Sequence, residues 1–177
     1  MSHSEISADF RSHFGSEPDF IAEVPGRVNL IGEHTDYNGL PVLPISIDKT
    51  IKAAVKSSPS KNVRIINKNS DYTETVFGLS EKIEPSPKGH WGNYIKASSQ
   101  ALYVRMKGEL SGADIFFEGN LPASAGLSSS SALVVISALA LLAANKTEMD
   151  FIELAEILAE GEKYVGTQGG GMDQAIC

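Results

Sequence analysis

The chain has 177 residues, of which 42% are hydrophobic, so it can bury one sizeable core or form one lobe of a larger enzyme. A formal net charge of −7 and a sequence pI near 5.1 argue against nucleic acid or an anionic membrane as a partner, since both select basic surfaces. The single cysteine, Cys177, excludes an intrachain disulfide and a cysteine-rich metal site.

Neither a secretory signal nor a membrane span is indicated by the sequence. The first nine residues lack the basic and apolar regions of a signal peptide. The longest apolar run, at 132–144, has about thirteen residues, whereas a span needs roughly twenty. We therefore expect a buried helix there and a cytoplasmic location for the protein.

Short strands are predicted first along the chain, and helices follow. Partial alternation of β-branched or aromatic residues between turn residues indicates strands at 21–24, 51–55, 63–66, 73–77 and 113–117. The later apolar patterning indicates helices at 93–107, 127–144 and 150–164. Thr147 and Asp150 form a short-acid capping box before the last helix. This order of elements is typical of a layered α+β domain.

The segment at 25–39 gathers a cation, two carboxylates and a histidine between glycines. Arg27 carries a permanent charge, and Glu33, His34 and Asp36 supply acceptors and one donor. Paired acceptors let a protein select the stereochemistry of sugar hydroxyls. The alternative is a simple turn after Asp36, with Glu33 and His34 as ordinary loop residues.

The stretch at 121–133 leads a loop containing proline and glycine into the apolar helix. A helix start presents free N–H groups and a positive dipole end, and four consecutive serines at 128–131 add further donors without charge. This combination predicts a phosphate cradle. The alternative, an N-cap after a serine-rich linker, accounts for one or two serines but not for four. The stretch lacks a Walker A lysine, which disfavours a P-loop nucleotide hydrolase.

Glu162 falls on an apolar helix face. Phe151, Ala155 and Leu158 share that face, and Glu162 joins them because eleven residues after Phe151 is almost a whole number of turns. An inward carboxylate is costly unless it is paired or bound to a cation. The alternative is a frayed helix end loosened by Gly161.

Two further features stand near predicted helices. At 166–176, Asp173 follows three consecutive glycines, which allow close approach to a ligand, and its carboxylate can accept a hydroxyl proton. A glycine loop with an aspartate cap would explain the same pattern without a site.

Trp91 is the sole tryptophan, and a core role is its simpler explanation.

Together these motifs resemble those of the GHMP small-molecule kinase family, in the branch of galactokinases and N-acetylgalactosamine kinases. Residues 25–39 resemble the galactokinase signature, 121–133 the motif Pro-x-Gly-x-Gly-Leu-x-Ser-Ser, and 166–176 the segment Gly-x-Met-Asp-Gln. Ser124 departs from the second motif, because it stands where a glycine is usual. The resemblance implies that residues 1–177 form the N-terminal lobe of such a kinase, with the ribosomal protein S5 domain 2-like fold: a mixed sheet with helices packed on one side.

The resemblance also implies a role for each candidate residue, with ATP as co-substrate and Mg²⁺ as metal ion. Asp173 would be the catalytic base, with Arg27 beside it. The implied sugar contacts are Arg27, Glu33, His34, Asp36, Gly170 and Asp173. The implied nucleotide contacts are Trp91, Gly126, Ser128, Ser129 and Ser130. Magnesium would be held through Ser129 and Glu162.

The implied reaction is phosphorylation of the anomeric C1 hydroxyl of a galactose-type sugar. Ser124, Ser131 and the triple glycine slightly favour N-acetylgalactosamine over galactose by similarity. One alternative is a non-catalytic regulator that binds sugar and ATP. The other is an inactive truncated lobe, because the family's C-terminal lobe would follow after Cys177. The expected partners are small molecules, not nucleic acid or membrane.

Overall fold

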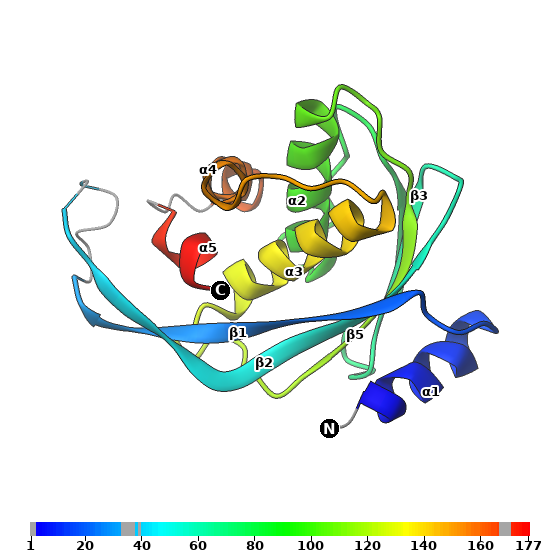
Figure 1. Cartoon of the computed structure of the whole chain (residues 1–177), viewed down its shortest axis with the longest axis horizontal. Coiled ribbons are helices and arrows are strands. Elements are labelled where there is room, and N and C mark those ends of the chain that lie inside the picture. The colour runs from blue at the N-terminus through cyan, green and yellow to red at the C-terminus, as the bar shows by residue number, and fades with distance from the viewer. Residues whose placement is uncertain (1–2, 33–37, 39, 167–170) are drawn as a thin grey trace.

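The computed structural model describes residues 3–32, 38, 40–166 and 171–177 (Figure 1). In chain order the elements are α1 (His3–Phe14), β1 (Phe20–Ile31), β2 (Leu43–Ser57), β3 (Asn62–Asn67), β4 (Thr75–Gly78), α2 (Gly92–Arg105), β5 (Ala113–Gly119), α3 (Ser129–Ala144), α4 (Phe151–Gly161), the 3₁₀ helix η2 (Glu162–Val165) and α5 (Met172–Ile176). Every predicted strand and helix is present, and α1 and α5 are additions that the sequence analysis did not predict.

The strands form one mixed sheet in the order β1-β2-β5-β3-β4. β3 and β5 run parallel, and the other neighbours are antiparallel. β1 is much longer than the predicted strand at 21–24, because it continues through Pro25 with register shifts at Pro25/Arg27 and Asn29/Ile31. An edge strand tolerates a proline, since only one side of it must donate to a neighbour. The α+β class and the mixed sheet are confirmed.

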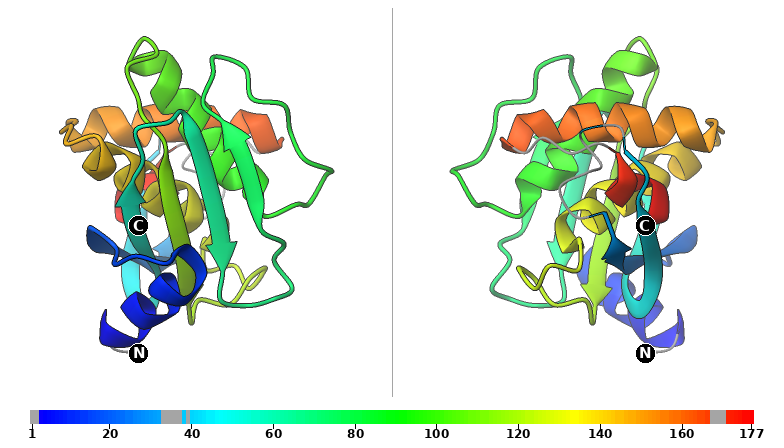
Figure 2. Two further views of the ribbon diagram at one scale, coloured as in Figure 1. Left: turned by 90° about the vertical axis from the view of Figure 1, so that its right-hand side faces the viewer. Right: turned by 90° about the vertical axis from the view of Figure 1, so that its left-hand side faces the viewer.

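Helices α2, α3 and α4 lie on one face of the sheet, where α3 packs on β1 and β2, and α2 packs against α3 and α4 (Figures 1 and 2). α3 is buried around its whole circumference, as the apolar run predicted, and Ile136 and Leu141 are fully inaccessible. They belong to one buried cluster with Ile115 and Phe117 of β5. No helix in the described part of the chain is long and apolar enough to cross a bilayer.

Helix α1 packs on the opposite face of the sheet (Figure 1). Ile6 and Phe10 are fully buried there against Ala54, Ile66 and Phe116. A β-strand alternates its side chains between faces, so Phe116 meets α1 while its neighbours meet the helices on the other side. The spacing of four between Ile6, Phe10 and Phe14 was the signal for this helix in the sequence.

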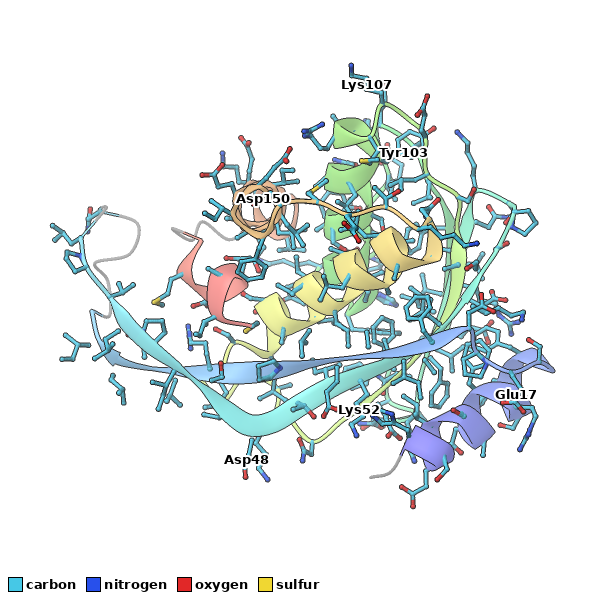
Figure 3. The ribbon with its side chains drawn as sticks, in the orientation of Figure 1. Glu17, Asp48, Lys52, Tyr103, Lys107 and Asp150 are labelled. Atoms are coloured by element: carbon cyan, nitrogen blue, oxygen red, sulfur yellow. The ribbon has the colours of Figure 1, made fainter. Side chains whose placement is uncertain are left out.

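The start of α4 corrects two sequence-based predictions. Asp150, labelled at the start of α4 in Figure 3, alone caps this helix. Its carboxylate accepts hydrogen bonds from the N–H groups of Ile152 and Glu153. The Thr147 hydroxyl donates instead to the Asn145 carbonyl oxygen, so no capping box forms. Phe151, which the predicted apolar face placed inward, is 52% exposed.

The buried face of α4 therefore begins one turn later than predicted. Leu154, Ala155 and Leu158 are buried. Glu162 follows in η2, after Gly161 has ended the α-helix, and it is only 6% exposed. The inward direction of Glu162 is confirmed, although the helix that carries it is not continuous.

The packing of α1 predicts a large effect of truncation at Phe10. Phe10→Ala should lower the free energy of unfolding by about 3–5 kcal/mol, because it leaves a cavity between α1 and the sheet. Urea denaturation followed by circular dichroism measures this. Ile152→Ala is the control, since that side chain is 69% exposed, and it should change the value by less than about 0.5 kcal/mol. Equal effects of the two changes would contradict this packing.

Candidate active site

Arg27 of β1 and Asp173 of α5 form a bidentate ion pair across 146 positions of the chain. Arg27 Nε donates to Asp173 Oδ1 at 2.7 Å, and Arg27 Nη2 donates to Oδ2 at 2.8 Å. Both side chains are partly buried. Two parallel charge-assisted hydrogen bonds fix the plane of the carboxylate as well as its position. The structure thus brings together the cation of the first motif and the carboxylate of the third.

The serine loop of the second motif is held against the same pair. Arg27 Nη1 donates to the Gly126 carbonyl oxygen at 2.9 Å, and the Arg27 N–H donates to the Leu127 carbonyl oxygen at 3.2 Å. The Ser128 hydroxyl donates to Asp173 Oδ2 at 2.5 Å. Three motifs that lie far apart in the sequence therefore meet in one hydrogen-bonded cluster.

Gly26 permits this contact between β1 and the loop. A Cβ atom at position 26 would lie 2.4 Å from Leu121 Cδ1 and 2.8 Å from the Leu127 carbonyl oxygen. Side chains are not found at such distances, so any other residue would push the loop away from the strand. The glycine of the first motif thus serves the second one, by close approach of backbone.

A cleft of about 860 Å³ opens beside the cluster. Its volume is within the range of small-molecule sites. Arg27 and the serine loop, including Gly126 and Ser128 to Ser130, line one part of it, and the rings of Tyr72 and Trp91 line another. The start of α3 contributes the partial positive charge of a helix N-terminus, which suits a phosphate.

Trp91 packs in the core at the start of α2. It is only 6% exposed, its indole Nε1 donates to the Thr73 carbonyl oxygen at 2.9 Å, and it meets Phe117 edge to face. The core role is therefore confirmed. The same ring also lines the cleft, so a nucleotide contact stays a prediction compatible with its position.

Glu162 faces the first turn of α3. Its Oε1 atom accepts a hydrogen bond from the buried hydroxyl of Ser131 at 2.9 Å. Ser129, the other predicted magnesium ligand, belongs to that same turn. Among the described residues no cluster of three or more His, Cys, Asp or Glu side chains forms a metal cage. One carboxylate and one hydroxyl nevertheless fit Mg²⁺, which usually takes one or two carboxylates together with phosphate oxygens and water.

Several predicted residues lie outside the described part of the chain. These are Glu33, His34 and Asp36 of the first motif and Gly170 of the third. Cys177, in contrast, is described. Burial, with the Asp173 carboxylate nearby, raises the pKa of its thiol to about 12, so the thiol is neutral at pH 7.

The comparisons with known proteins agree with this geometry. A sequence model of the galactokinase galactose-binding signature matches residues 8–57, and one of the GHMP kinases N terminal domain matches residues 93–177. A galactokinase from Candida maltosa is 39% identical over 98% of this chain and 86% of its own length. The crystal structure of Lactococcus lactis galactokinase complexed with galactose superposes with a TM-score of 0.85 and 28% identity, over 98% of this chain and 45% of that one.

The fold and the cluster of motifs are those of a GHMP kinase N-terminal domain. The chain belongs to the galactokinase family within that class, because the Candida maltosa relative matches it over most of both sequences. A galactokinase from Dictyostelium discoideum is 38% identical over 98% of this chain, but the match covers 36% of that protein. The chain thus spans about a third of this longer relative.

The close approach at Gly26 predicts that even a methyl group is harmful there. Gly26→Ala should lower the free energy of unfolding by about 1–3 kcal/mol, because the added Cβ overlaps Leu121 and the Leu127 carbonyl. Chemical denaturation measures the change. Gly78→Ala is the matched control, since a Cβ there meets only Asn62 Oδ1 at an ordinary 3.7 Å. An unchanged stability of Gly26→Ala would show that the strand and the loop are not in contact.

Proposed function

We propose that the protein containing this chain transfers the γ-phosphoryl group of ATP to the anomeric C1 hydroxyl of a galactose-type sugar. One observation carries the proposal: Asp173 shares a hydrogen-bonded cluster with the serine loop at the edge of the cleft. A candidate proton acceptor and a candidate phosphate cradle thus lie side by side. Transfer of a phosphoryl group to a hydroxyl needs that juxtaposition.

The residues of the cluster divide the chemistry between them. Asp173 accepts the proton of the sugar hydroxyl or orients that hydroxyl for attack. Arg27 holds the carboxylate in place, and its charge compensates the negative charge of the transferring group. The N–H groups at the start of α3 and the hydroxyls of Ser129 and Ser130 bind the phosphates, with Gly126 allowing close approach. Trp91 contacts the adenine.

Ser129 and Glu162 would hold a magnesium ion beside the phosphates. Such an ion would offset the negative charge of the phosphates during the transfer. The contribution of the chain is a buried carboxylate whose direction is set by Ser131. This arrangement supports the metal role that the resemblance implied for Glu162.

The sugar is contacted by Glu33, His34, Asp36 and Gly170, in addition to the Arg27 and Asp173 pair. The galactokinases of Candida maltosa and Dictyostelium discoideum, and the galactose complex of the Lactococcus lactis enzyme, support galactose as the sugar. N-acetylgalactosamine rests on Ser124, Ser131 and the glycines at 169–171. We propose galactose as the first substrate to test and N-acetylgalactosamine as the second.

Residues 1–177 act in this proposal as an N-terminal lobe, to which a C-terminal lobe adds the remainder of the nucleotide site. Cytoplasmic location stays a prediction. The proposed partners are the sugar and ATP.

Sugar-1-phosphate formation tests the function directly. With ATP, Mg²⁺ and either sugar, phosphorus NMR should detect the product, and Asp173→Asn should lower the rate by roughly a hundredfold or more, because the proton acceptor is lost. Asp48→Asn is the matched control on the exposed part of β2, and it should retain full activity (Figure 3).

The other outcomes separate the alternatives. Binding of ATP and sugar without any product would contradict a kinase and indicate a sugar- and ATP-binding regulator. A folded 177-residue chain that binds neither ligand would indicate an inactive lobe. Product formation that survives in Asp173→Asn would overturn the role given to Asp173.

A further inference from the structure

Ser128 has an unusual backbone conformation at the centre of the candidate active site. Its φ and ψ angles are 54° and 37°, in the left-handed region that residues other than glycine rarely adopt. Strain of this kind persists where the surrounding structure holds it, and it is concentrated at functional sites. The conformation belongs to the residue just before α3 begins, so it sets the direction in which the Ser128 side chain leaves the loop.

The Ser128 side chain is directed at the carboxylate of Asp173. Ser128 is 9% exposed, and its hydroxyl donates to Asp173 Oδ2 at 2.5 Å. It makes no cap for α3, where a serine at this position normally accepts a bond from the helix N–H groups. The Ser128 hydroxyl therefore bonds to Asp173 instead of capping the helix.

The hydrogen bonds divide the two carboxylate oxygens unequally. Among the described residues, Oδ2 receives Arg27 Nη2 and the Ser128 hydroxyl, whereas Oδ1 receives only Arg27 Nε. An ionised carboxylate has about four acceptor positions, two on each oxygen. Counting only the described residues, Oδ2 has both of its positions occupied and Oδ1 has one of its two occupied.

We propose that Ser128 is a positioning residue for the phosphoryl transfer, whose hydroxyl fills Asp173 Oδ2 and leaves Oδ1 as the atom that receives the sugar hydroxyl. This inference rests on the proposed function. It changes the role predicted for Ser128, because a hydroxyl bonded to Asp173 is not a phosphate ligand. Phosphate contact then falls to Ser129, Ser130 and the backbone N–H groups at the start of α3.

The test separates the hydroxyl from the backbone strain by using two variants. Ser128→Gly removes the hydroxyl and relieves the left-handed strain, whereas Ser128→Ala removes the hydroxyl and keeps the strain. Ser128→Asn tolerates the same conformation and restores an N–H donor. Ser12→Ala, on α1 across the sheet, is the control for an exposed serine and should match the wild type.

Two quantities are measured for each variant. The kcat for sugar-1-phosphate formation should fall roughly ten- to a hundredfold in both Ser128→Gly and Ser128→Ala, because the carboxylate loses one of its fixed donors, and it should recover in part in Ser128→Asn. The Kd for a non-hydrolysable ATP analogue, read from the fluorescence of Trp91 in the cleft, should stay within about twofold of the wild type.

The possible results separate a positioning role of Ser128 from phosphate binding, from backbone strain and from failure of the proposed function. A Kd that rises severalfold with kcat unchanged would overturn the proposal and return Ser128 to phosphate binding. A loss in Ser128→Ala alone would assign the effect to strain and not to the hydroxyl. A wild-type protein that forms no product would reject the proposed function itself, and the role of Ser128 with it, whereas an active wild type with fully active variants would reject the role of Ser128 only.

Discussion

The bidentate ion pair between Arg27 and Asp173 is the interaction on which the candidate active site depends. It joins β1 to α5, and the same guanidinium holds the Gly126 carbonyl, so one side chain connects all three motifs. Both partners are partly buried, so removal of either leaves the other charge without its neutralising partner. A lysine could not replace Arg27, because only a planar fork of donors spans both carboxylate oxygens and the loop.

The rest of the fold holds the Arg27–Asp173 pair against the serine loop, whose backbone is strained at Ser128. β1 is held in position by its pairing with β2. Gly26 has no side chain, so the serine loop can come close to β1 at Leu127. α3 is buried on all sides, so its packing in the apolar core holds the helix start in place next to the left-handed residue Ser128. The packing of the core therefore supports the geometry of the candidate active site.

Much of this could be predicted from sequence, because the signals are local. The serine loop, the aspartate after glycines and the inward Glu162 are all indicated by short spacings, and at the start of α3 Ser128 bonds to Asp173 and Ser131 bonds to Glu162. Contacts between residues far apart in the sequence could not be predicted from these local patterns. The pairing of Arg27 with Asp173 came from family resemblance, and the bond from Ser128 depends on a φ value that no residue pattern encodes. Phe151 was misplaced because periodicity gives a face but not where the core ends.

The most direct test of this account is a double-mutant cycle on Arg27 and Asp173, measured as the rate of sugar-1-phosphate formation. Arg27→Met, Asp173→Asn and the double variant should fall to about the same residual rate, because residues that act as one unit are not additive. Losses that multiply in the double variant would show that the two side chains act independently, and would contradict the claim that their pairing organises the site.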